Sequence, residues 1–501
     1  MIGSGLTGAI NILFTGSTLG WLLVGILLGI VIGAIPGLGP NLGLAVVLPL
    51  TVRLNGPDAI ILLISIYSGA MYGGSIASIL INTPGTAAAA ATTLDGYQMT
   101  RQGRAMDALS ISATASAVGG LFAIVTLILL TPYLTTLVLL FGSPEYFLIA
   151  LFGIALITVV ARGSLVKGLT AGAFGLLLST IGFPIAVGQP RYTFDTMLLF
   201  DGLNFVAVLI GIFAIGEMIK LAGERGGIAK DGVDMDGSVI SGVVDVFRAP
   251  ITTIKSGYIG MFIGAIPGSG ASIANFVSYA ETVRSGSGDE EYGSGNHHGV
   301  IASEAANNGT VAGSLIPTFS FGIPGSGSTA ILLGGLMMHG LNPGPELFTT
   351  NIDITYSVFL SLLIGNIVIL AVGLFFITKT SYVTVVNSNY LIPLVIVFST
   401  LGSLGLRGNW LDVFTVLFFG VFGFFLMTYD YSIIAFVLGI ILGPIAEENL
   451  IRSLQLSDGS LMIFVEEPIP LLLTLMTVAL VGLPLLKAIA SPIRRYVASA
   501  R

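Results

Sequence analysis

The chain has 501 residues, of which 54% are apolar and only 9% are charged, against roughly 25% charged residues in an average soluble domain. A soluble core of this length cannot bury so much apolar sequence, so the composition excludes an ordinary soluble protein and favours a chain in a lipid bilayer. The net charge of -7 lies mainly in connecting segments and says little about partners. The sequence contains no cysteine, which excludes disulfides, iron–sulfur clusters and thiol catalysis.

Apolar stretches near the length of a membrane span, about 17–25 residues, recur along the whole chain. The residues before the first stretch include no Lys or Arg, so that stretch is predicted to be a transmembrane helix and not a cleaved signal peptide. The predicted spans are 17–35, 57–81, 106–131, 133–160, 165–186, 203–222, 254–267, 300–322, 353–378, 389–405, 411–428, 430–446 and 468–489. Shorter apolar pieces, predicted to be half-helices or re-entrant hairpins, follow Gly/Pro breaks at 40–52, 86–94, 271–280 and 326–338. The sequence therefore predicts an all-α polytopic membrane protein with about twelve transmembrane helices.

Two polar stretches divide this pattern. The predicted organisation is a first membrane repeat at 1–222, a cytoplasmic linker at 223–253 and a second membrane repeat at 254–501. Arg225, Lys230 and Arg248 place the linker on the cytoplasmic side by the positive-inside rule. The second polar stretch, 284–299, is predicted to be a flexible exposed loop, and its adjacent residues His297 and His298 are expected to face solvent.

Two pairs of Pro-Gly motifs occur in the same order in the two halves. GAIPGLG at 33–39 returns as GAIPGSG at 264–270, and six of these seven residues are identical. Pro84 and Gly85 in the first half align with Pro324 and Gly325 in the second. Each half thus contains a first break, a connecting helix and a second break, which indicates an ancestral duplication. We expect the two repeats to be inverted, although the span count alone leaves their parity open.

These breaks indicate a binding site. Pro removes a backbone donor and Gly weakens the helix, and the freed backbone groups cannot face lipid. Helices that restart after a break direct free N–H groups and partial positive charge at a ligand, which suits a carboxylate. A single break is usually only a packing kink, but breaks at matching positions in two halves are typical of secondary-transporter sites. The predicted substrate-binding residues are Pro36, Gly37, Gly39, Asn41, Asn82, Thr83, Pro84, Gly85, Thr86, Pro267, Gly268, Ser269, Gly270, Ser272, Pro324, Gly325, Ser326, Gly327 and Ser328.

A few polar residues inside the apolar runs are candidates for holding a coupling ion, either Na⁺ or H⁺. Glu304 could carry a proton or help to bind Na⁺, or it could be an ordinary carboxylate at the start of a helix. Asn307 and Asn308 lie deeper in the same run, and Asn275 follows the third break. No other metal and no cofactor is expected.

Other charged residues and motifs give weaker evidence about function. Asp95, Arg101 and Arg104 are better explained as a solvated loop with ordinary topogenic arginines than as gating charges. The sequence has no HExxH motif, no GxSxG elbow and no Walker A loop, so the chain is predicted not to be an enzyme. No basic patch interleaved with aromatic residues supports binding to nucleic acid.

The motifs resemble the large membrane subunit of the tripartite tricarboxylate transporters. The resemblance extends over nearly the whole chain and rests on GAIPGLGPNLGLAVVLPLT at 33–51, on 72–105, on GAIPGSGASIANF at 264–276 and on 302–348. It implies the translocation subunit of an ion-gradient-driven secondary transporter in the bacterial inner membrane. It also implies a small membrane subunit and a periplasmic solute-binding protein as partners, and a carboxylate such as a tricarboxylate as substrate. The alternative is a channel-like or scaffold subunit without coupled transport.

Overall fold

The computed structural model describes residues 2–156, 165–184, 188–223, 235–268, 270–286, 291–376 and 388–480. Over these ranges every regular element is a helix, and one isolated backbone bridge joins Gly182 to Arg191. Seven helices are long and apolar enough to cross a membrane, judged by length and composition alone. The all-helical, membrane-type architecture is therefore confirmed, while the predicted total of about twelve spans stays a prediction.

The chain forms two compact units, which do not follow the boundaries of the predicted repeats. Unit 1 comprises Met1–Val138 and Val206–Phe425, and unit 2 comprises Leu139–Phe205 and Leu426–Arg501. Unit 2 thus takes one segment from each predicted repeat. All four Pro-Gly breaks belong to unit 1.

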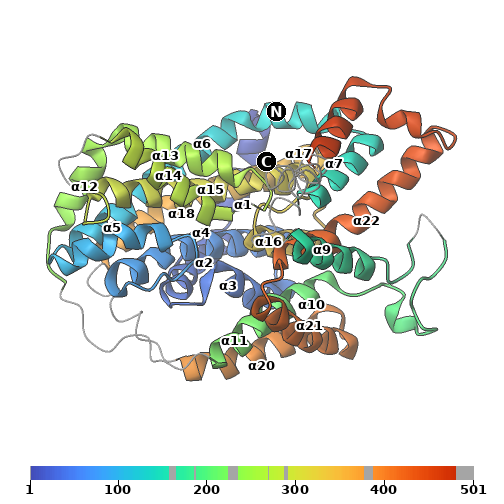
Figure 1. The fold of residues 1–501 in the computed structure, drawn as a ribbon, viewed down its shortest axis with the longest axis horizontal. Helices are drawn as coiled ribbons and strands as arrows, with labels where there is room; N and C mark the ends of the chain where they lie inside the picture. Colours follow the sequence, from blue (N-terminus) through green and yellow to red (C-terminus); the bar gives the residue numbers. More distant parts are fainter. Residues whose placement is uncertain are drawn as a thin grey trace, which may run out of the picture. The chain divides into compact units, whose positions relative to one another are not determined.

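Unit 1 contains the paired helices that carry the breaks (Figure 1). Its helices are α1 (Ile2–Leu13), α2 (Gly16–Ala34), α3 (Gly39–Val47), η1 (Leu48–Arg53), α4 (Gly56–Ile81), α5 (Ala90–Arg101), α6 (Ala105–Leu139), α10 (Phe205–Ile210), η3 (Gly211–Ile215), α11 (Gly216–Gly223), α12 (Val239–Arg248), α13 (Pro250–Gly264), α14 (Gly270–Ser285), α15 (His297–Phe321), α16 (Gly327–Met338), α17 (Pro345–Phe348), α18 (Ile352–Phe375), α20 (Ser388–Arg407) and α21 (Trp410–Thr428). The predicted linker therefore includes a helix, α12.

Unit 2 is organised around one long helix. Its helices are α7 (Ser143–Ala155), α9 (Leu165–Ser179), η2 (Met197–Leu199), α22 (Ile433–Leu456), η5 (Leu461–Phe464) and an apolar helix at Pro468–Leu480. Both α7 and α9 pack against α22. Arg191 pairs with Glu447 in the second half of α22, with an Nη2 to Oε1 distance of 2.7 Å.

One predicted boundary between spans is wrong. The sequence suggested separate spans at 106–131 and 133–160, but α6 continues through Pro132 to Leu139. Pro132 has no N–H to donate to the carbonyl of Ile128 one turn earlier, yet the helix continues past it. Two threonines beside it bond to other carbonyls of the helix. Thr131 Oγ1 donates to the oxygen of Leu127 at 2.8 Å, and Thr136 Oγ1 donates to the oxygen of Pro132 at 3.0 Å.

Glycine allows the same close packing in two helix pairs, α2 with α4 and α13 with α15 (Figure 1). Four glycines of each pair have a matched glycine in the other pair. A Cβ atom added at any of these eight glycines would clash with a carbonyl oxygen of the partner helix. The clashes are matched in the two repeats: Gly29 with Ile66 and Gly260 with Ala306, Gly33 with Ala70 and Gly264 with Thr310, Gly69 with Ile26 and Gly309 with Gly257, Gly73 with Ile30 and Gly313 with Met261. The sequence repeat therefore extends, residue by residue, into the packing of the helices.

The central helices of the two repeats, α4 and α15, also contact each other, and they run antiparallel. Residue numbers fall along α4 as they rise along α15 in the hydrogen bonds that join them, Ser75 with Glu304, Met71 with Asn307 and Tyr67 with Ser314.

The loop before α15 is held by a buried carboxylate, contrary to the prediction of a solvated loop around Asp95. Asp95 lies on α5 and is fully buried. Its Oδ1 atom accepts backbone N–H groups from Gly293, Gly295 and Asn296 at 2.8–2.9 Å. Its Oδ2 atom accepts the hydroxyl of Tyr279 at 2.9 Å. We call this set of contacts the Asp95 latch, because it ties α5 of the first repeat to the α14–α15 loop of the second.

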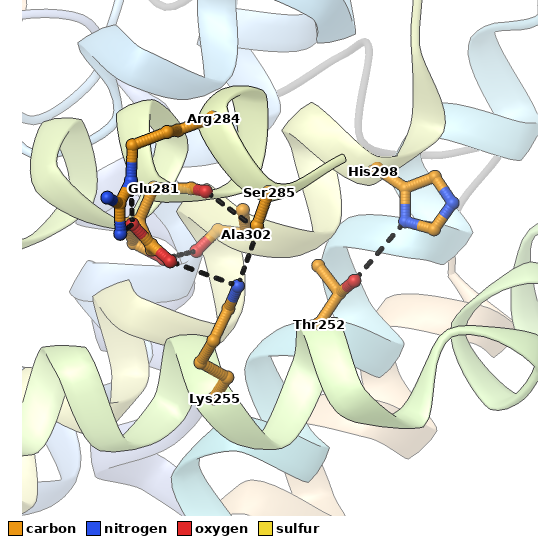
Figure 2. A network of polar contacts seen from close by, with 8 residues as sticks. Thr252, Lys255, Glu281, Arg284, Ser285, His298 and Ala302 are labelled. Atoms are coloured by element: carbon orange, nitrogen blue, oxygen red, sulfur yellow. Dashed lines mark hydrogen bonds and ion pairs between the residues drawn. The ribbon is translucent and has the colours of Figure 1, made fainter. Parts of the chain in front are cut away.

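The two adjacent histidines belong to a helix, which corrects their assignment to an exposed loop. His297 and His298 form the first turn of α15 and are half-buried. Figure 2 shows His298 Nδ1 beside Thr252 Oγ1 of α13, at 3.4 Å. The same figure shows Lys255 of α13 directed at Glu281 of α14, with an Nζ to Oε1 distance of 3.6 Å. These contacts join α13 to the two helices that follow it.

Candidate functional site

Each of the four breaks lies between the end of one helix and the start of the next. Helices α3, α5, α14 and α16 begin at Gly39, Ala90, Gly270 and Gly327. Matched positions adopt the left-handed backbone conformation that glycine favours: Gly37 and Gly268 have φ values of 83° and 76°, and Gly39 and Gly270 have values of 47° and 65°. The sequence prediction that helices restart after the breaks is therefore confirmed.

The second break of each repeat starts from another matched left-handed residue. Asn82 ends α4 with φ of 55°, and Gly322 ends α15 with φ of 68°. Asn is one of the few residues besides Gly that adopts this conformation readily. The left-handed backbone conformation thus explains why residue 82 is Asn, independently of any contact with substrate.

Within each repeat the two breaks touch. A Cβ atom added at Gly85 would clash with the carbonyl oxygen of Gly33, and one added at Gly325 would lie 3.0 Å from the oxygen of Gly264. The N–H of Gly268 also donates to the oxygen of Gly325 at 3.0 Å. The first and second breaks are therefore packed backbone to backbone.

Between the repeats, side chains join the breaks crosswise. Ser328 on α16 donates its hydroxyl to Asn41 Oδ1 on α3 at 2.6 Å. Asn275 on α14 donates from Nδ2 to the carbonyl oxygen of Ala88, which precedes α5, at 2.9 Å. Together with the contacts inside each repeat, these two bonds link the four breaks into a closed ring, which we call the break ring.

The break ring brings helix N-termini together in two pairs. Asn41 and Ser328 lie in the first turns of α3 and α16, so these two N-termini adjoin. Asn275, in the second turn of α14, contacts the residue two before α5. N-termini carry free N–H groups and partial positive charge, so this arrangement favours an anion. A π-helical segment, η3, also reaches the ring: a Cβ atom at Gly327 would lie 3.1 Å from the Phe213 ring.

Glu304 is fully buried among hydroxyl groups. Its carboxylate accepts Ser75 Oγ at 2.6 Å, Ser116 Oγ at 2.9 Å and Ser112 Oγ at 3.1 Å, and it also accepts Thr92 Oγ1. All five side chains are at most 1% exposed. No ion pair to Glu304 is found over the described ranges of the chain. We call these four hydroxyl side chains the hydroxyl cage; they come from α4, α5 and α6, whereas Glu304 belongs to α15.

The three asparagine candidates for ion coupling are buried, and each uses only part of its hydrogen-bonding capacity. Asn307 donates to the oxygen of Met71 at 2.8 Å, and Asn308 donates to Asn366 Oδ1 at 3.1 Å. The Oδ1 atoms of Asn275, Asn307 and Asn308 are buried and have no hydrogen-bond partner. Such acceptor oxygens suit a hard cation such as Na⁺.

The structure places most predicted substrate-binding residues in or beside the break ring, and some away from it. Asn82 and Thr83 are exposed, and the Thr83 hydroxyl donates to the carbonyl oxygen of Ile81, the last residue of α4. Gly37 is also exposed, and Ser269 lies outside the described residues. Ring residues that are buried or half-buried are Pro36, Gly39, Asn41, Pro84, Gly85, Thr86, Pro267, Gly268, Gly270, Ser272, Pro324, Gly325, Ser326, Gly327 and Ser328.

Sequence reasoning did not single out the hydroxyl cage. Ser112 and Ser116 are four residues apart in an apolar run, which puts both on one face of a helix, and this spacing was the available signal. Ser75 and Thr92 flank the second break, but their distance from Glu304 in the sequence hides the contact.

Residues 19–438 match the family model described as the tripartite tricarboxylate transporter TctA family. The chain is 34% identical over 471 residues, 94% of each protein, to an Agrobacterium vitis protein described as an uncharacterized 52.8 kDa protein in the TAR-I ttuC' 3'region. It is 30% identical over 232 residues, 46% of this chain and 96% of the other, to an uncharacterized protein in the TAR-II ttuC' 3'region of the same organism. No solved structure matches the chain. Because the family model covers most of its length, the chain belongs to the tripartite tricarboxylate transporter TctA family.

Proposed function

We propose that the chain is the translocation subunit of a tripartite secondary transporter, which imports a carboxylate such as a tricarboxylate across the bacterial inner membrane. The ion gradient of Na⁺ or H⁺ drives uptake, and a small membrane subunit and a periplasmic solute-binding protein complete the assembly. The family supports a membrane component of tricarboxylate transport. The single observation that carries the mechanism is the break ring, which joins four helix restarts in one place.

The substrate site in this proposal is the break ring. Carboxylate oxygens would accept N–H groups at the starts of α3, α5, α14 and α16, where the helix dipoles favour negative charge. The hydroxyl of Ser328 and the amide of Asn41 are neutral, so the attraction for an anion would come from the helix N-termini. Such a site resembles those of other secondary transporters with interrupted helices.

The two repeats are inverted in this proposal. The antiparallel crossing of α4 and α15 supports it, because a two-fold axis in the membrane plane requires equivalent helices to cross antiparallel. Inverted repeats give inward-open and outward-open states of similar energy, and movement of one repeat against its surroundings would alternate access to the ring.

Uptake by the reconstituted assembly tests the proposal. We expect the complete assembly in liposomes to accumulate a radiolabelled carboxylate against its gradient, and to lose accumulation when the Na⁺ and proton gradients are both collapsed. A panel of mono-, di- and tricarboxylates would define the substrate. Uptake that survives collapse of both gradients would instead indicate a channel-like or scaffold subunit.

A matched pair of alanine variants tests the position of the site. In Gly327→Ala the new methyl group would lie 2.8 Å from Asn41 Nδ2 and displace the α3–α16 contact. We expect a loss of uptake of order ten-fold or more, because small displacements of binding groups have large effects on rate. Gly20→Ala on α2 is the control, since its added methyl group meets nothing within 4 Å. Equal uptake by the two variants at equal expression would contradict a site in the break ring.

A further inference from the structure

Glu304 is a fully buried carboxylate whose side-chain hydrogen bonds all come from hydroxyl groups. An ionised carboxylate buried without a cation is costly, and protonation or a bound cation in part of the transport cycle would remove that cost. The atoms around the Glu304 carboxylate favour protonation over a bound metal ion. The oxygens of Ser75 and Ser116 lie 2.6 Å and 2.9 Å from the carboxylate, which are direct hydrogen-bond distances and leave no room for a metal ion between them.

Hydroxyl groups suit both protonation states of a carboxyl group. A hydroxyl can donate to an ionised carboxylate, and after rotation it can accept from a protonated one. The hydroxyl cage can therefore hold Glu304 in either state without moving a helix. A lysine or arginine in the same place would hold the ionised state only.

Other titratable groups near Glu304 do not compete for this role. Tyr72 on α4 interacts electrostatically with Glu304, but a phenol stays neutral near pH 7. Asp95, one turn further along α5, is engaged by the Asp95 latch. Asp107, in the first turn of α6, accepts the N–H of Ser238 at 3.0 Å and lies 3.7 Å from Arg104. His298, at the start of α15, contacts Thr252.

We propose that Glu304 is the proton-carrying residue of this chain and that the hydroxyl cage is its docking site. This inference rests on the proposed transport function and deepens it. A proton from the side of higher proton concentration forms an O–H bond with a carboxylate oxygen of Glu304, and the side-chain charge changes from −1 to 0. The same bond breaks when the proton leaves on the other side. The cage belongs to the first repeat and Glu304 to the second, so protonation weakens a polar attachment between the two repeats.

The test separates the driving force from transport itself. The complete assembly in liposomes is given either an inward pH gradient, acidic outside, or an inward Na⁺ gradient, and substrate accumulation and substrate exchange are both measured. For the wild type we expect the pH gradient alone to drive accumulation. For Glu304→Gln we expect loss of that accumulation, with exchange of internal for external substrate retained, because exchange needs no net proton movement. Glu448→Gln, a carboxylate that is half exposed in unit 2, is the control.

The outcomes distinguish the two claims. Absence of carboxylate transport by the wild type under every gradient would overturn the proposed function. Transport that the pH gradient drives equally well in the wild type and in Glu304→Gln would overturn the proton site alone, as would wild-type transport driven only by Na⁺.

A second variant tests the same proposal if Glu304→Gln does not reach the membrane. Ser116→Ala removes one donor to the ionised carboxylate and so favours the protonated form. We expect the midpoint of the pH dependence of uptake to move upward by about one pH unit, since a hydrogen bond to a charged group contributes roughly 1.5 kcal/mol. A midpoint that does not move would contradict the proposal, because a purely structural role would alter the amount of transport and not its pH dependence.

Discussion

At the scale of single residues, the glycines and asparagines of the breaks are needed for different physical reasons. Gly85 is required by lack of space, since a Cβ atom there would meet the backbone of Gly33, whereas one at Gly327 would meet the Asn41 side chain and displace it. Asn82 and Gly322 occupy matched left-handed positions, where backbone conformation selects the residue. Sequence reasoning identified Asn82 by its polarity, but its exposed side chain and positive φ indicate a different reason for its presence.

Two substitutions at Asn82 separate these roles. Asn82→Gly keeps the left-handed backbone, so we expect uptake and thermal stability to stay near those of the wild type. Asn82→Val forces a β-branched residue into that conformation, and we expect a loss of about 1–2 kcal/mol in stability. Uptake and thermal unfolding in detergent measure the two effects. If Asn82→Gly lost uptake while keeping its stability, the side chain would contact substrate after all.

At the scale of elements, the Asp95 latch connects a half-helix to a distant loop. Three backbone N–H groups of residues 293–296 converge on one carboxylate oxygen. The latch joins α5, which follows the second break, to the segment between α14 and α15. Movement of α5 therefore requires either that this loop follow it or that the latch open.

Asp95→Asn should weaken the latch without changing its shape. An amide oxygen accepts hydrogen bonds more weakly than an ionised carboxylate, so we expect a loss of about 1–3 kcal/mol. Hydrogen exchange at the amides of Gly293, Gly295 and Asn296 should then become faster than in the wild type. Glu291→Gln, an exposed neighbour in the same loop, is the control and should leave these rates unchanged. Unchanged exchange in Asp95→Asn would show that the loop is held by other contacts.

The elements also show what the sequence could and could not predict. Pro36 and Pro84 act on their own turn of helix, so the breaks and the restarting helices were visible in the sequence. Pro132 has the same local chemistry but lies inside α6, which continues to Leu139, so a proline alone does not mark the end of a helix. The surroundings of Glu304 come from three helices far away in sequence, and no local pattern encodes such a contact. Local signals therefore predicted the breaks, while partners across the fold had to come from the structure.

At the scale of the whole molecule, the matched glycine contacts allow the same substitution to be compared in the two repeats. Gly73 on α4 and Gly313 on α15 face equivalent carbonyl oxygens of α2 and α13. Alanine at either position would overpack its helix pair, at a cost of about 1–3 kcal/mol. If the repeats are inverted, the two variants disturb opposite conformational states.

Labelling from the two sides of the membrane tests that expectation. The chain has no cysteine, so Thr86→Cys or Ser326→Cys gives a single reporter at matched positions of the two second breaks. We expect Gly73→Ala and Gly313→Ala to change the reaction with an impermeant maleimide in opposite directions. Shifts in the same direction would argue against inverted repeats.

The duplication is not complete at Glu304, and this bears on the electrical balance of a turnover. In the register that pairs Gly73 with Gly313, the residue of α4 that corresponds to Glu304 is Ile64, an apolar residue that is also fully buried. The chain thus has two copies of the helix packing but a single acid at this position. One turnover through Glu304 would move one proton, which neutralises only part of the charge on a di- or tricarboxylate. Import would then carry net negative charge inward unless further cations bind, and the sign of the current across a planar bilayer would report how many do.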